Sequence, residues 1–71
     1  MQRNLDRFNL SNSEVYYLID QWIRNDRDRE ILKDRLINGL TYERLAEKHD
    51  MSVRQTKNIV YKATERLVAH L

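Results

Sequence analysis

Six polar side chains between Arg54 and Lys62 carry the chemistry that binding to duplex DNA requires. Lysine and arginine neutralise phosphates or bond to guanine O6 and N7. Asparagine and glutamine form paired bonds to adenine, and tyrosine packs on a sugar or a thymine methyl group. Together with two residues of a preceding short helix, they form the predicted DNA-binding set: Arg54, Gln55, Lys57, Asn58, Tyr61, Lys62, Thr41 and Arg44.

These side chains need a helix that presents them on one face, and the sequence predicts such a helix over 53–68. Ser52 and Gln55 form a capping box at its start. At 100° per residue, most of the polar side chains lie opposite a narrow apolar arc. The arc consists of Thr56, Ile59, Val60, Ala63 and Leu67.

Positive charge is concentrated in the last segment of the chain. Residues 52–71 carry four Lys or Arg against Glu65, a net of +3, whereas residues 1–51 carry nine Lys or Arg against ten Asp or Glu, a net of −1. A basic end on a nearly neutral body is typical of a module that meets an anion with one face. An ordinary solvated helix end gives the same charge pattern, so the preceding turn must decide between the two.

A short helix and a tight turn come directly before this segment. Thr41 caps the short helix, and Leu40 with Leu45 forms a hydrophobic staple across the cap. His49 and Asp50 end it, because aspartate tolerates a left-handed turn better than most residues, and Met51 returns toward the core. A capped short helix, a tight turn and a capped amphipathic helix together predict a helix-turn-helix.

Two further helices precede the motif. Ser11 and Glu14 form a capping box for a helix over 12–24, whose apolar stripe includes Trp22 as a core residue. Asn25 or Asp26 caps the next helix, which buries Ile31, Leu32 and Leu36 and stops at Gly39. Residues 1–10 have no clear period, which predicts a partly disordered arm. The expected fold is therefore all-α, a single domain over 1–71 of about four helices with a C-terminal helix-turn-helix.

The composition argues against several other classes of protein. The chain of 71 residues has no Cys, and it has neither an apolar run long enough to span a bilayer nor a signal-peptide core, so we expect a cytoplasmic protein that does not enter a membrane. We expect no cofactor, no metal and no enzymatic activity, because no nucleophile with a base, ligand cluster or phosphate-binding Gly loop is present. His49 and His70 are expected at the surface. The acids Asp26, Asp28 and Glu30 alternate with Arg27 and Arg29, which predicts helix-dipole and ion-pair roles for them.

Three segments in order, 26–32, 39–46 and 52–67, resemble region 4 of sigma-70 family factors over about residues 26–68. In that family, region 4 recognises the minus-35 promoter element and contacts the flap of RNA polymerase. The resemblance places the base-reading positions at Arg54, Lys57 and Asn58. Lys57 stands where Arg is usual, Asn58 where Gln is usual, and Arg54 where Glu is frequent, so a different target sequence is implied. Asp50 replaces the common Gly of the turn.

Nothing in the chain resembles region 2, the part that melts promoter DNA. The resemblance therefore implies a stand-alone regulator, of a kind common in phages and mobile elements, or one half of a split factor. The expected partners are double-stranded DNA and RNA polymerase. A homodimer is a further expectation, because one helix-turn-helix reads only a few base pairs.

Two other functions remain open from the sequence. The apolar arc of the first helix could grip RNA polymerase or a partner sigma subunit, which would make the chain a protein-interaction module. The arc consists of Val15, Tyr16, Leu18, Ile19, Trp22 and Ile23. Alternatively, a phage DNA-packaging subunit would use the same motif to recognise a packaging site.

Overall fold

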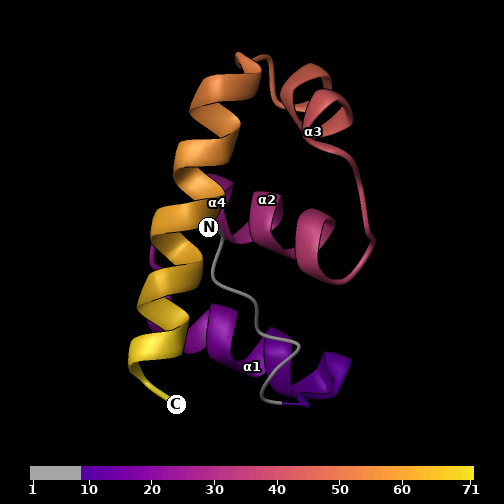
Figure 1. Ribbon diagram of the computed structural model, residues 1–71. Helices are drawn as coiled ribbons and strands as arrows, with labels where there is room; N and C mark the ends of the chain where they lie inside the picture. The colour runs from indigo at the N-terminus through magenta and orange to yellow at the C-terminus, as the bar shows by residue number, and fades with distance from the viewer. Residues whose placement is uncertain (1–8) are drawn as a thin grey trace.

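The computed structural model describes residues 9–71 and contains four helices and no strand within that range. The helices are α1 (Asn12–Trp22), α2 (Asp26–Leu36), α3 (Tyr42–Lys48) and α4 (Val53–Ala69). In Figure 1, α1 and α2 cross one side of the long helix α4, and α3 lies beside the beginning of α4. The predicted all-α fold is confirmed. The first helix is two residues shorter than predicted, because Ile23 is already extended (φ −108°, ψ 114°).

A side chain caps the start of each helix, as predicted. The capping residues are Ser11, Asn25, Thr41 and Ser52. At α4, the Gln55 amide donates to Ser52 Oγ over 3.1 Å, and the Gln55 side chain accepts from the Ser52 amide over 3.2 Å. These bonds satisfy amides that have no partner inside the helix, so the sequence itself fixes where α4 begins.

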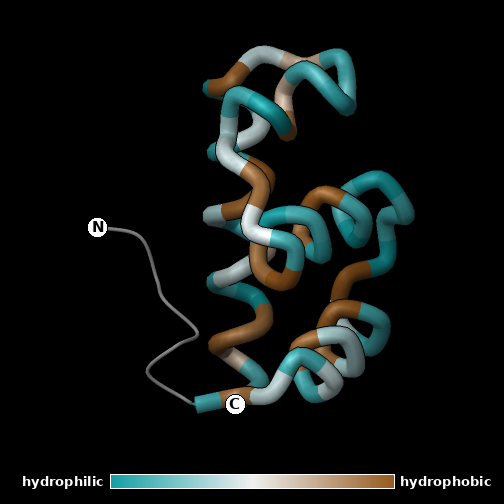
Figure 2. The backbone as a smooth tube through the Cα atoms, turned by 90° about the vertical axis from the view of Figure 1, so that its right-hand side faces the viewer, coloured by the Kyte–Doolittle hydropathy of each residue, from teal (hydrophilic) through white to brown (hydrophobic). Residues whose placement is uncertain are grey.

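All four helices contribute to one core. The completely buried aliphatic side chains are Ile19, Ile31, Leu32, Leu45, Val60 and Leu67. Of the predicted α4 arc, Thr56, Val60, Ala63 and Leu67 are buried, and Ile59 packs against the core while partly buried. Figure 2 shows the hydrophobic segments of the backbone turned toward one another between the helices. Burial of each large aliphatic side chain stabilises the fold by about 1.5–3 kcal/mol, so α4 is held by its apolar edge.

Two predicted environments are wrong. Trp22 was expected in the core, but it is 37% exposed, and its ring stacks on His70 with 3.5 Å between ring centroids. It is the last residue of α1, and the core position beside it is taken by the next residue, Ile23, which is 5% exposed. His49 was expected at the surface, but its side chain is only 9% exposed because it packs toward α2.

The predicted disordered arm over 1–10 can be compared with the structure only at residues 9 and 10, because residues 1–8 lie outside the described part of the chain. Within the described part, Asn9 adopts a turn and Leu10 packs against the core cluster. For these two residues the expected disorder is not found.

Ion pairs at the start of α2 confirm the predicted role for Asp26 and Asp28, whereas Glu30 forms no ion pair with the described residues. Arg29 pairs with Asp26 at 3.6 Å, and Arg27 pairs with Asp28 at 3.4 Å. Arg29 also donates to the carbonyl oxygens of Ile23 and Asp20. The short turn between the two helices is thus fixed by one guanidinium group.

Asp34 forms a buried polar cluster that the sequence did not reveal. It is 5% exposed, and its carboxylate accepts from Lys48 Nζ at 2.8 Å and from Asn38 Nδ2 at 3.1 Å, with His49 Nε2 at 3.4 Å. Burial raises the pKa of the Asp34 carboxyl, but the hydrogen bonds from Lys48, Asn38 and His49 outweigh burial and hold the pKa below its usual range. The cluster ties α2 to the end of α3, where the turn of the helix-turn-helix begins.

We predict that Asp34→Asn lowers the free energy of unfolding by about 1.5–3 kcal/mol near neutral pH, because it removes charge-assisted hydrogen bonds from a buried site. The folded pKa is depressed, so the stabilisation is complete above the unfolded pKa of about 3.9 and is lost as pH falls through the folded value. Urea denaturation at a series of pH values measures both effects. The difference between the two proteins should shrink in acid, and a difference independent of pH would contradict the assigned role of the carboxylate.

Candidate nucleic-acid interface

The turn between α3 and α4 is closed by backbone hydrogen bonds. His49 is the C-terminal cap of α3, Asp50 takes a left-handed conformation with φ 54°, and the Met51 amide donates to the Ala46 carbonyl oxygen over 2.9 Å. Met51 is partly buried against the core, as predicted. Because α3 is short and the turn is tight, the position of α3 is coupled directly to the start of α4.

The entry into α3 is equally well defined. Gly39 has φ 72°, the left-handed conformation predicted at the end of the second helix. The Leu40 amide then donates to the Asp34 carbonyl oxygen over 3.0 Å, and Arg35 Nη1 donates to the Leu40 carbonyl oxygen over 2.9 Å. The Thr41 hydroxyl accepts from the Arg44 amide, so the chain enters α3 in one direction only.

The outer face of α4 is open to solvent. Every member of the predicted DNA-binding set is exposed: Arg54, Gln55, Lys57, Asn58, Tyr61 and Lys62 on α4, with Thr41 and Arg44 at the start of α3. None of them is covered by α1. The structure therefore leaves this face accessible to a large partner, and contact with DNA remains a prediction.

A cluster of aromatic and cationic side chains spans α2, α3 and α4. The rings of Tyr42 and Tyr61 meet edge to face with 6.2 Å between centroids. Lys57 Nζ lies 5.6 Å from the Tyr42 ring centroid and Arg35 Cζ 4.3 Å from it. Such contacts are worth about 0.5–1 kcal/mol at exposed sites. Tyr42 thus contacts both Lys57 and Tyr61, a connection that sequence analysis missed because no helical period links Tyr42 to α4.

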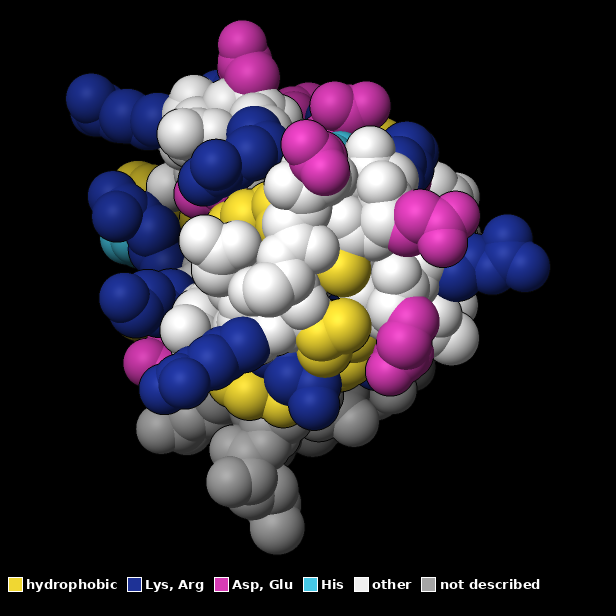
Figure 3. Space-filling view, turned by 90° about the horizontal axis from the view of Figure 1, so that it is seen from above, with side chains coloured by type: hydrophobic (Ala, Val, Ile, Leu, Met, Phe, Trp, Pro, Cys, Tyr) yellow, Lys and Arg dark blue, Asp and Glu magenta, His cyan; other side chains and the backbone are white. Residues whose placement is uncertain are grey.

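Cations without a carboxylate partner gather around α4. Among residues 9–71, four Lys or Arg form ion pairs with acidic side chains: Arg27, Arg29, Lys33 and Lys48. The remaining cations except Arg35 have neither an ion pair nor a side-chain hydrogen bond within that range, and they are Arg24, Arg44, Arg54, Lys57, Lys62 and Arg66. Four of these six belong to α4. Figure 3 shows Lys and Arg side chains along the edge of the molecule on which α4 lies.

Two other kinds of functional feature were sought among residues 9–71, a metal centre and a membrane-spanning helix. Within 9–71, no group of three His, Cys, Asp or Glu side chains is placed to hold a metal ion. No helix in this range is long and apolar enough to cross a membrane.

Comparison with known protein families supports the interpretation of α3 and α4 as a helix-turn-helix. A protein-family model described as Sigma-70, region 4 matches residues 25–68, which is more than half of the chain. The match begins at the cap of α2 and includes α2, α3 and most of α4, but not α1. No curated protein and no solved structure matches the chain. The matched family is one of DNA-binding helix-turn-helix domains and not of enzymes.

We predict that Asp50→Gly raises the free energy of unfolding by about 0.5 kcal/mol, because glycine adopts the left-handed conformation without steric cost. The matched control is Gly39→Ala, which places a Cβ at φ 72° with no neighbouring atom within 4 Å. It should lower stability by about 1 kcal/mol through backbone strain alone. Urea denaturation measures both changes. A loss of stability in Asp50→Gly would show that the Asp50 side chain itself stabilises the turn.

Proposed function

This chain belongs to the sigma-70 region 4 family, and from that premise we propose that it is a sequence-specific transcription regulator that reads promoter or operator DNA with α4. The observation that carries the proposal is that the cations on α4 differ from those on the rest of the described surface in their pairing with acidic side chains. Among residues 9–71, four of the seven Lys and Arg outside α4 are paired with acids, whereas none of the four on α4 has a carboxylate partner. Unpaired cations on one face are the electrostatic footprint of a polyanion partner.

The dimensions of α4 suit the major groove of DNA. An α-helix with its side chains is about 10–12 Å across, and the major groove is about 12 Å wide. We assign base reading to Arg54, Lys57 and Asn58, which face outward near the start of the helix. Thr41 and Arg44, at the start of α3, are assigned to the phosphates of one strand, since such contacts fix the orientation of the motif.

The interface is held in place before DNA arrives. Thr56, Val60 and Leu67 anchor the opposite edge of α4 in the core. On the outer side, the contacts with Tyr42 restrict Lys57 and Tyr61. Side chains that are already ordered lose less conformational entropy on binding, which favours affinity.

The alternative of a protein-interaction module is less well supported. It requires the apolar arc of α1 to be free for a partner. Four of the six residues of that arc are buried in the core of this chain itself: Val15, Leu18, Ile19 and Ile23. Of the arc, only Tyr16 and Trp22 remain partly exposed, so the arc itself offers little apolar surface to a partner, and Tyr17, which is 63% exposed, lies outside it.

Selection of one DNA site needs more than one short helix. A single helix-turn-helix reads only a few base pairs, so useful specificity arises from a larger assembly. RNA polymerase is the partner that family membership favours. We therefore propose that the chain acts on promoter DNA together with polymerase, and that a second copy of the chain serves the same purpose at operators.

Titration against a short duplex, recovered by selection from random sequences, tests the proposal. Lys57→Ala and Arg54→Ala should each weaken binding by about 1–3 kcal/mol at fixed salt. The matched control is Lys33→Ala, because Lys33 is paired with Asp20 at 3.0 Å on the α1 side of the molecule. Affinity for the wild-type protein should fall steeply as salt rises. Equal affinity of wild type, Lys57→Ala and Arg54→Ala would reject α4 as the reading helix.

A further inference from the structure

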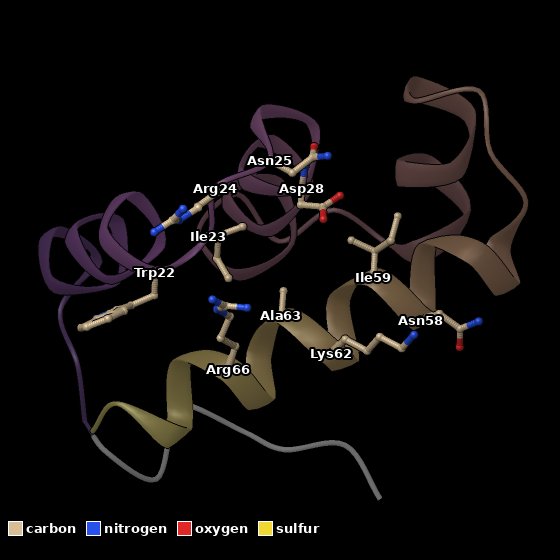
Figure 4. A pocket seen from close by; sticks show the side chains of 10 residues that line it. All are labelled: Trp22, Ile23, Arg24, Asn25, Asp28, Asn58, Ile59, Lys62, Ala63 and Arg66. Carbon is tan, nitrogen blue, oxygen red and sulfur yellow. The ribbon is translucent and has the colours of Figure 1, made fainter.

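A groove of about 370 Å³ runs between the α1–α2 turn and α4. Its floor is apolar and is formed by Ile23, Ile59 and Ala63. Its rim carries three cations, Arg24 from the turn and Lys62 and Arg66 from α4. In Figure 4, the Arg66 side chain extends from α4 toward the segment 22–24. Lys62 and Asn58 project from the same helix, nearer its N-terminal end. We propose that this groove binds the phosphates of the second DNA strand.

The groove carries net positive charge. Its three cations have no carboxylate partner among residues 9–71. Asp28 is the one acidic residue that lines it, and the carboxylate of Asp28 is already engaged by Arg27 at 3.4 Å. An anion that enters the groove therefore meets three cations and one neutralised acid.

The groove is continuous with the proposed DNA-binding face. Asn58 and Lys62 belong to both. The two flanks of α4 are distinct, because Lys57 and Tyr61 contact Tyr42 of α3, whereas Lys62 and Arg66 line the groove on the side of the α1–α2 turn. The cations thus bracket the base-reading residues from both sides.

A helix in the major groove has one phosphodiester strand on each flank. On the α3 flank, the proposed function assigns one strand to Thr41 and Arg44. The other strand must then pass the opposite flank, where Arg24 and Arg66 stand. This inference rests on the proposed function and extends its contact surface to both strands.

An acidic protein segment is a poorer occupant of the groove. Such a ligand gains affinity by burying apolar side chains on an exposed apolar floor. Here Ile23 is 5% exposed and Ala63 is 8% exposed, Ile59 is partly buried, and the more exposed Trp22 ring is already stacked on His70, so the groove offers such a segment little free apolar surface. Phosphates need only the charged rim, which the groove provides.

Arg24 comes from the connection between α1 and α2. Arg24 precedes the segment 25–68 that the family model matches. It follows Ile23, whose extended backbone ends α1 and leads into α2. The connection to α1 thus supplies a cation beside α4 that lies outside the matched segment.

The test is titration of the selected duplex by Arg24→Gln and Arg66→Gln over a range of salt concentrations. Each change should weaken binding about three- to tenfold and reduce the slope of log affinity against log salt by about 1. The matched control is Lys33→Gln, since Lys33 pairs with Asp20 at 3.0 Å and neither residue lines the groove. Phosphate-ethylation interference should identify phosphates on both strands whose ethylation prevents binding.

The outcomes separate this inference from the proposed function. Unchanged affinity and salt slope in Arg24→Gln and Arg66→Gln, with strong losses in Arg54→Ala, would overturn the groove and leave the reading helix in place. An equal loss in Lys33→Gln would also overturn it, because the effect would then come from net charge. No DNA binding by the wild-type protein would overturn both proposals.

Discussion

Burial of one edge of α4 is the constraint on which the rest of the structure depends. This helix contacts each of the other three, and its buried side chains complete a core that a chain of this length could not otherwise close. The 100° rotation per residue then leaves the opposite edge in solvent. The same periodicity that stabilises the fold therefore presents a row of cationic and amide side chains that stability does not require.

Polar contacts fix the remaining helices relative to that edge. Arg29 joins the α1–α2 turn to α2, and Asp34 joins α2 to the end of α3. Tyr42 carries the connection from α3 to the outer face of α4 through its contacts with Tyr61 and Lys57. A change at the buried Asp34 is thus linked through α3 to the side chains assigned to DNA. The fold and the interface form one connected unit.

Sequence analysis predicted what depends on neighbours along the chain. The caps at Ser11 and Ser52, the left-handed turns at Gly39 and Asp50, and the two edges of α4 all follow from local chemistry. The predictions were wrong for side chains whose burial or exposure is decided by contacts between distant segments of the chain. The burial of His49 with Asp34 joins residues 15 positions apart. The exposure of Trp22 and the groove beside Arg24 likewise depend on how the α1–α2 turn meets α4, which no local period encodes.

Nuclear magnetic resonance of the labelled protein during addition of the selected duplex tests most directly whether the outer face of α4 binds DNA. We expect the largest changes at the backbone and side-chain signals of Arg54, Lys57 and Asn58, with small changes at the buried Val60 and Leu67 on the same helix. Changes confined to α1, with the outer face of α4 unaffected, would contradict the account.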